Sequence, residues 1–172
     1  MDWSVALPNI WFLLITVLFT GFFVLEGYDF GVGVLAQLLG KDDIEKRVYF
    51  NTIGPFWDAN EVWLLTGGGA MFAAFPIWYG KLFSGYYIAF VLMLVALILR
   101  GVSFEFRGKL GDNRKWIKAC DFAMFIGSLL PPVLWGVAVA NFMTGANLDQ
   151  GKNLVDGFLG LLSPFTILGG IM

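Results

Sequence analysis

The sequence predicts an all-α membrane protein, a polytopic bundle of transmembrane helices. Three observations lead to this class. Of the 172 residues, 58% are hydrophobic and only 14% are charged, against about 25% charged in a typical soluble domain. The hydrophobic residues fall in runs of about 20 or more, the length that an α-helix needs to cross the hydrocarbon core. The charged residues gather mainly between those runs.

Four runs are long enough to span a membrane, and we expect a single transmembrane domain over residues 1–172. The four full spanning helices are predicted at about 8–39, 49–75, 78–100 and 119–142. A fifth run, 154–172, is still apolar at the last residue, so we expect a truncated fifth helix there. On this expectation the sequence is the N-terminal part of a longer subunit, or one half of a split one.

The first run is longer than one crossing needs. A helix over residues 8–39 would be about 48 Å long at about 1.5 Å per residue, against a hydrocarbon core of about 30 Å. We therefore expect this helix to tilt, to overhang the bundle or to break.

The basic residues predict how the helices are oriented. Nine of the eleven Lys and Arg residues lie in the connections after the first and third helices: Lys41, Lys46, Arg47, Arg100, Arg107, Lys109, Arg114, Lys115 and Lys118. Because Lys and Arg stay on the cytoplasmic side of a membrane, we expect both connections to be cytoplasmic and the N-terminus to lie outside. Asp121 opens the predicted fourth helix, where a negative charge suits the helix dipole.

Composition excludes several functions. A net charge of −2 without a basic face argues against a nucleic-acid partner. With no histidine and one cysteine, the chain can form neither an internal disulfide nor a His-ligated or Cys-rich metal site. A haem held by these residues alone would need Met or an unusual ligand.

Two carboxylates lie inside the second apolar run, in the stretch WDANEVW. Asp58 and Glu61 are three residues apart, so a helix places them on one face, in the cytoplasmic half of the membrane. An ionised carboxylate there costs at least about 2.5 kcal/mol on insertion scales. We expect both acids to be buried against protein or water and to exchange protons with the cytoplasm. The alternative is a structural pair with Arg100 or a Trp indole that only fixes helix packing.

The first helix carries a second acidic pair. In EGYDFGVG, Glu26 and Asp29 repeat the three-residue spacing toward the cytoplasmic end. The two pairs could line one proton path. Because the first helix is long, Asp29 could instead lie at the membrane interface, where a solvated carboxylate costs little.

The residues alone leave two function classes open. One is a subunit of a redox complex whose cofactors lie in another chain. The other is half of a secondary transporter or ion-coupled membrane protein with carboxylates inside the membrane. Composition does not choose between them.

Three longer motifs carry a resemblance that does distinguish these classes: GYDFGVG at 27–33, WDANEVWL at 57–64 and GGGAMFAAFP at 67–76. Together they resemble subunit II of the cytochrome bd ubiquinol oxidases. The resemblance covers about the first half of that family's eight-helix subunit. It implies a bacterial inner-membrane complex that oxidises quinol, reduces dioxygen to water and contributes to proton-motive force.

The resemblance also implies partners and residue roles. Subunit I would carry two haem b and one haem d, so this chain itself would bind no cofactor. Small accessory subunits are further candidate partners. Quinone would be the substrate and a candidate structural lipid, and the bilayer the surroundings. Asp58 would belong to a proton route toward the haems, and Trp63 would lie near a route by which oxygen enters.

Overall fold

The computed structural model describes residues 2–109, 111, 113–145 and 162–172. The helices within them are α1 (Trp3–Leu39), α2 (Asp43–Ile53), α3 (Trp57–Ala74), α4 (Pro76–Gly85), α5 (Tyr87–Phe106), α6 (Arg114–Thr144) and α8 (Pro164–Ile171). These described residues contain no strand, so the predicted all-α class is confirmed.

Three of the described helices, α1, α5 and α6, are each long and apolar enough to cross a membrane. α3 and α4 pass the same test together, although they meet at a bend of 118°. The described chain therefore has three candidate spans, or four if the bent pair is one. Part of the predicted helix over 154–172 lies outside the described residues, and four full spans plus a truncated fifth stays a prediction.

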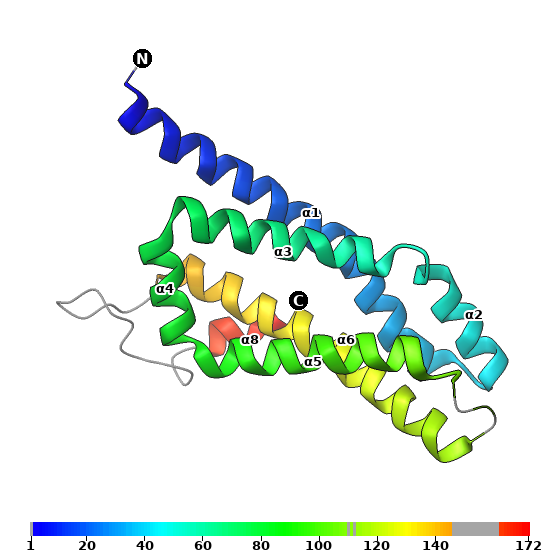
Figure 1. Ribbon diagram of the computed structural model, residues 1–172. Helices are drawn as coiled ribbons and strands as arrows, with labels where there is room; N and C mark the ends of the chain where they lie inside the picture. Colours follow the sequence, from blue (N-terminus) through cyan, green and yellow to red (C-terminus); the bar gives the residue numbers. More distant parts are fainter. Residues whose placement is uncertain (1, 110, 112, 146–161) are drawn as a thin grey trace.

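α1 is a single helix of 37 residues. Asp2 caps its N-terminus by accepting a hydrogen bond from the backbone N–H of Ser4 at 3.0 Å. The N-terminal part of α1 extends beyond α3 (Figure 1). The extra length therefore appears as an overhang beyond the neighbouring helices, and the helix does not break.

The single helix predicted over 49–75 is wrong, because the structure has α2 and α3 there with a break at Gly54–Phe56. Pro55 explains the break, since proline lacks a backbone N–H and its ring clashes with the preceding turn. α2 begins earlier than predicted: Asp42 caps it by accepting from the N–H of Glu45 at 2.8 Å. Much of the predicted first cytoplasmic connection is therefore helical.

The helix predicted over 78–100 is likewise two helices, α4 and α5, which meet at Tyr86. Pro76 both ends α3 and starts α4. It pushes Phe75 out of helical backbone geometry (φ −133°, ψ 59°), and it occupies the first helical turn, where proline is tolerated. α4 consequently crosses one end of the bundle between α3 and α5 (Figure 1).

The fourth predicted helix begins earlier than 119. Asn113 caps α6 by accepting from the backbone N–H groups of Lys115 and Trp116. Asp121 therefore lies inside α6 and not in its first turn, so its predicted role at the helix start is wrong.

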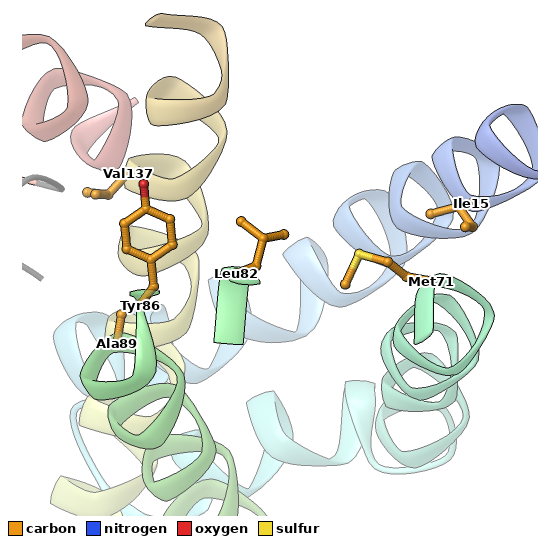
Figure 2. Close-up of a cluster of buried hydrophobic side chains, with 6 residues drawn as sticks. All are labelled: Ile15, Met71, Leu82, Tyr86, Ala89 and Val137. Carbon is orange, nitrogen blue, oxygen red and sulfur yellow. The ribbon is translucent and has the colours of Figure 1, made fainter. Parts of the chain in front are cut away.

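α6 is the helix around which the others pack: α1, α5 and α8 all contact it, while α3 and α2 pack on α1. An apolar cluster contains buried side chains from α1, α3, α4, α5 and α6, drawn in Figure 2. Its buried members are Ile15, Met71, Leu82, Tyr86, Ala89 and Val137. The polar residues described next lie farther along the same helices.

Candidate functional site

An arginine and two glutamates from three helices meet inside the bundle. Arg100 on α5 and Glu26 on α1 are both fully buried. The Nη1 group of Arg100 donates a hydrogen bond to Glu26 Oε1 and a second, at 3.2 Å, to Glu61 Oε1 on α3. The guanidinium carbon also lies 4.7 Å from the centre of the Phe30 ring. Arg100 therefore ties α1, α3 and α5 together.

A third carboxylate adjoins this cluster. Asp29 is buried on α1, and its Oδ2 accepts a hydrogen bond from Asn60 Nδ2 on α3 at 2.8 Å. We call Glu26, Asp29, Asn60, Glu61 and Arg100 the inner cluster. It contains three carboxylates and one guanidinium; Glu26 and Asp29 are buried, and the Glu61 side chain is 24% exposed. Such an excess of acid with little access to water is costly unless protons are bound.

Local sequence explains how these side chains come together. The spacing of Glu26 and Asp29 puts both on one face of α1, toward α3. On α6, Gly127 lets the backbone of α5 approach closely: a Cβ there would lie 2.7 Å from Cβ of Arg100 and 3.0 Å from its backbone N. Any larger residue at position 127 would displace the α5 turn that carries the arginine.

Asp58 does not join the inner cluster. It lies in the first turn of α3 and is exposed, so the expectation that it is buried in this chain is wrong. A carboxylate in a first helical turn is favoured by the helix dipole. Asp58 and Glu61 therefore differ in surroundings although they are one turn apart.

Trp63 lies on the α1–α3 contact. It is partly buried, and a Cβ added to Gly21 would lie 2.6 Å from its ring. The indole therefore packs flush against the backbone of α1, in a place that only glycine permits.

A second charged group, which the sequence did not predict, lies where α2, α5 and α6 meet. Asp121 accepts from Arg107 Nε at 2.7 Å and from Lys46 Nζ at 3.0 Å. Arg107 Nη2 reaches Asp43 at 2.7 Å, and Asp43 also pairs with Arg47 at 2.8 Å. We call Asp43, Lys46, Arg47, Arg107 and Asp121 the end network. It brings the two basic connections to the same end of the bundle.

The charges of the end network shift one another's pKa. Burial alone would raise the pKa of Asp43, but the hydrogen bond and charge of Arg107, with those of Arg47, outweigh it and lower that pKa below its ordinary value. Burial alone would lower the pKa of Arg107, but its hydrogen bonds to Asp121 and Asp43 prevail and raise it. Both groups are therefore charged at neutral pH.

A pocket of about 470 Å³ lies between α1, α6 and α8, beside the inner cluster. Its walls are mostly apolar, with side chains such as Phe22, Phe165 and Leu168. Glu26 and the indole of Trp135 also line it. The Nε1 group of Trp135 makes no hydrogen bond to the described residues.

The chain offers few ligands for a metal or a haem iron. Its sequence has no histidine, and the described residues hold no group of three or more Cys, Asp or Glu side chains placed to bind a metal ion. These residues therefore do not fit a haem site, and no chemical step is assigned to one on this chain.

The fold and the inner cluster define a class: a multi-pass membrane protein that holds ionisable groups inside its helix bundle. The family can also be stated. The model of the family "cytochrome bd terminal oxidase subunit II" matches residues 7–172, and the chain belongs to this family.

Individual relatives agree with this assignment. The chain is 53% identical over 166 residues to the cytochrome bd ubiquinol oxidase subunit 2 of Bacillus subtilis, an alignment that covers 96% of this chain and 49% of the relative. It is 45% identical over 176 residues to the cytochrome bd-I ubiquinol oxidase subunit 2 of Escherichia coli, with 100% and 46% covered. The chain thus spans about half the length of the curated relatives it matches.

Proposed function

We propose that this chain serves as subunit II of a membrane quinol oxidase of the cytochrome bd type. Its family and the names of its relatives support this role over that of a secondary transporter. In the complex, haem groups would supply the electron transfer and oxygen chemistry. The resemblance to the family implies two haem b and one haem d on a partner, subunit I, and the absence of histidine from this sequence agrees with that division. Small accessory subunits are further candidate partners.

The contribution of this chain would be a supply of protons from the cytoplasm. The observation that carries this proposal is the inner cluster, where Glu26, Asp29 and Glu61 face a single guanidinium. One arginine balances one carboxylate, so further ionised acids in this position would be unfavourable. The cluster therefore holds at least one exchangeable proton, and Arg100 keeps the remaining charge compensated.

Asp58 would act earlier on the same route. It is exposed at the start of α3, one turn from Glu61, so it can take up a proton at the surface and pass it along the helix. Trp63, two residues beyond Glu61 on α3, remains our candidate for lining the route by which oxygen enters. If so, Trp63→Ala should change the apparent KM for oxygen more than the maximal turnover.

The quinone would act as substrate at subunit I and as a structural lipid on this chain. The pocket between α1, α6 and α8 has the apolar walls that an isoprenoid quinone needs. The indole of Trp135 could donate a hydrogen bond to a ring oxygen. Extraction of the purified complex should then yield more than one quinone per complex, and Trp135→Phe should lower that ratio.

The complex would lie in the bacterial inner membrane, with the N-terminus of this chain outside and the end network facing the cytoplasm. The excess of Lys and Arg at that end supports this orientation. In a variant with Cys120 replaced by Ser, a single cysteine at Arg114 should resist an impermeant reagent in intact cells and react in inverted membranes. If this cysteine is labelled from outside intact cells, the proposed orientation is wrong, and so is the proposed direction of proton uptake.

The proton role is tested by Glu61→Gln in the full complex. The amide retains the shape of the side chain but cannot carry the proton, so oxygen consumption per haem d should fall by about tenfold or more. Glu105→Gln is the matched control, because Glu105 is exposed near the end of α5. Haem content is determined separately. Normal turnover in a fully assembled Glu61→Gln complex would leave the inner cluster with a packing role only.

A further inference from the structure

The contact between α1 and α6 contains buried polar atoms that the fold itself does not satisfy. Ser128 is fully buried on α6, and its Oγ makes no hydrogen bond to the described residues; nor do Gln37 Nε2, Arg100 Nε, Arg100 Nη2 or Glu26 Oε2. Each such group costs about 1–3 kcal/mol if it stays unpaired, and native proteins contain few of them. Several in one region call for partners that the described residues do not supply.

The serine is unusual even within this bundle. A buried Ser or Thr in a helix normally donates to the carbonyl four residues earlier. The exposed Thr16, Thr20 and Thr66 do so here, each at 2.8 Å. Ser128 makes no bond of this kind, so its hydroxyl is left for another partner.

These atoms line one seam between the two helices. On α1, Glu26, Gly33 and Gln37 follow one another at spacings of seven and four, so they share a face over about 16 Å. Ser128 occupies the space that Gly33 leaves open, since a Cβ on Gly33 would lie 2.6 Å from Cβ of Ser128 and overlap its Oγ. Arg100 packs against Gly127, the residue next to Ser128.

The seam begins at the end network. Lys46 Nζ donates to Gln37 Oε1 at 2.7 Å and to Asp121 at 3.0 Å. The Lys46 side chain retains 20% exposure, so this end of the seam reaches the surface. From this end toward the inner cluster, the seam contains the unpaired atoms of Gln37, then Ser128, then Arg100, and it ends at Glu26.

We propose that Ser128 and Gln37 are positioning residues that hold water molecules in this seam, and that protons reach the inner cluster from the end network through it. A buried water typically makes two to four hydrogen bonds and satisfies such polar groups. In each transfer the Ser128 hydroxyl accepts a proton from one water and donates its own proton to the next, so the serine itself is unchanged. Met124, which is fully buried beside the seam, keeps it from being an open channel.

This inference rests on the proposed proton role of the inner cluster. The seam carries most of the protons, and the route along α3 that starts at Asp58 is a second, slower entrance. The test uses the full complex with Ser128→Ala, which removes the hydroxyl without adding bulk, and with the double variant Ser128→Ala/Gln37→Leu. The double variant should lower turnover per haem d by about tenfold and raise the solvent deuterium isotope effect. Ser84→Ala, on the exposed surface of α4, is the matched control and should change neither quantity.

The outcomes separate the two proposals. Normal turnover and isotope effect in the double variant, with Glu61→Gln slow, would overturn the seam and leave the proton role intact. Normal turnover in Glu61→Gln as well would overturn both. If the double variant fails to assemble, a cryo-EM map of the unmodified complex that resolves waters decides. Water density bonded to Ser128 Oγ supports the seam, whereas a protein or lipid atom at that position overturns it.

Discussion

The inner cluster and the end network are built from the same kinds of residue but differ in charge balance. The inner cluster sets three carboxylates against one arginine. The end network sets Asp43 and Asp121 against Lys46, Arg47 and Arg107. Paired charges of the second kind hold helices together at a membrane surface. An excess of acid in the bundle interior favours bound protons, and this is why we propose the first group for proton transfer.

The two groups also differ in exposure. Arg100 and Glu26 have side chains that are 1% and 0% exposed. In the end network Arg107 and Asp121 are nearly as buried, at 7% and 10%, whereas Arg47 and Asp43 retain 54% and 42%. Removing one partner of a fully buried pair leaves a charge that water cannot reach, while removing one at the surface lets water replace it. Substitutions in the two groups should therefore have unequal effects, and the following four experiments measure that difference.

The largest effect is expected for Arg100→Met. This change leaves Glu26 and Glu61 without their counter-charge, which should cost about 3–5 kcal/mol and appear as a loss of assembled complex. Yield and thermal unfolding of the purified complex measure it. Arg47→Met is the control, because the Arg47–Asp43 pair is about half exposed and should cost less than about 1 kcal/mol. Equal losses in both variants would remove the distinction between the two groups.

The second largest loss of stability is expected for Asp121→Asn. The side chain is 10% exposed and pairs with both Lys46 and Arg107, so two cations lose their partner at once. We expect a loss of about 1.5–3 kcal/mol, seen as a lower unfolding temperature. Glu105→Gln, an exposed carboxylate on α5, should leave the unfolding temperature almost unchanged. A stable Asp121→Asn complex would show that the end network is not needed to fasten α2 to α6.

A smaller effect is expected for Glu26→Gln. If the inner cluster holds a proton, Arg100 keeps Glu61 as its counter-charge and the neutral amide should cost less than about 1 kcal/mol. The double variant Glu26→Gln/Glu61→Gln is the matched contrast, since it leaves Arg100 without a hydrogen-bonded carboxylate and should unfold at a clearly lower temperature. A single variant as unstable as the double would mean that Glu26 is ionised in the folded protein.

The smallest effect is the loss of the stability contributed by Asp43 at low pH. Because the pKa of Asp43 is lower in the folded protein than in the unfolded chain, its contribution to stability is present above about pH 3.9 and is lost as the pH falls through the folded pKa. The side chain is 42% exposed, so that contribution should stay below about 1 kcal/mol. Unfolding temperatures of the original and Asp43→Asn complexes should differ near neutrality and converge below about pH 4. A constant difference across this range would contradict the assignment.

Much of the fold could be predicted from the sequence alone. The length and composition of its apolar runs predicted an all-α membrane protein, because a helix is the structure that satisfies the backbone of a single segment in lipid. Reading 49–75 as one helix missed the interruption at Pro55, and reading 78–100 as one missed the break at Tyr86, whereas the predicted boundary between residues 75 and 78 coincides with the interruption at Pro76. The motifs around Asp29 and Asp58 pointed to the family, which the comparison confirmed.

Only the tertiary structure decided which charged residues meet. From the sequence, Asp58 and Glu61 appeared equivalent, and either acid could have paired with Arg100 or with a Trp indole. The packing of α5 against Gly127 brings Arg100 to Glu26 and Glu61 and leaves Asp58 exposed. Asp121, predicted to favour the start of a helix, instead joins Lys46 and Arg107 across 75 and 14 residues of sequence. Hydrophobic periodicity records which residues avoid water, whereas contacts between distant charges depend on how closely helix backbones approach, and that is settled by packing in three dimensions.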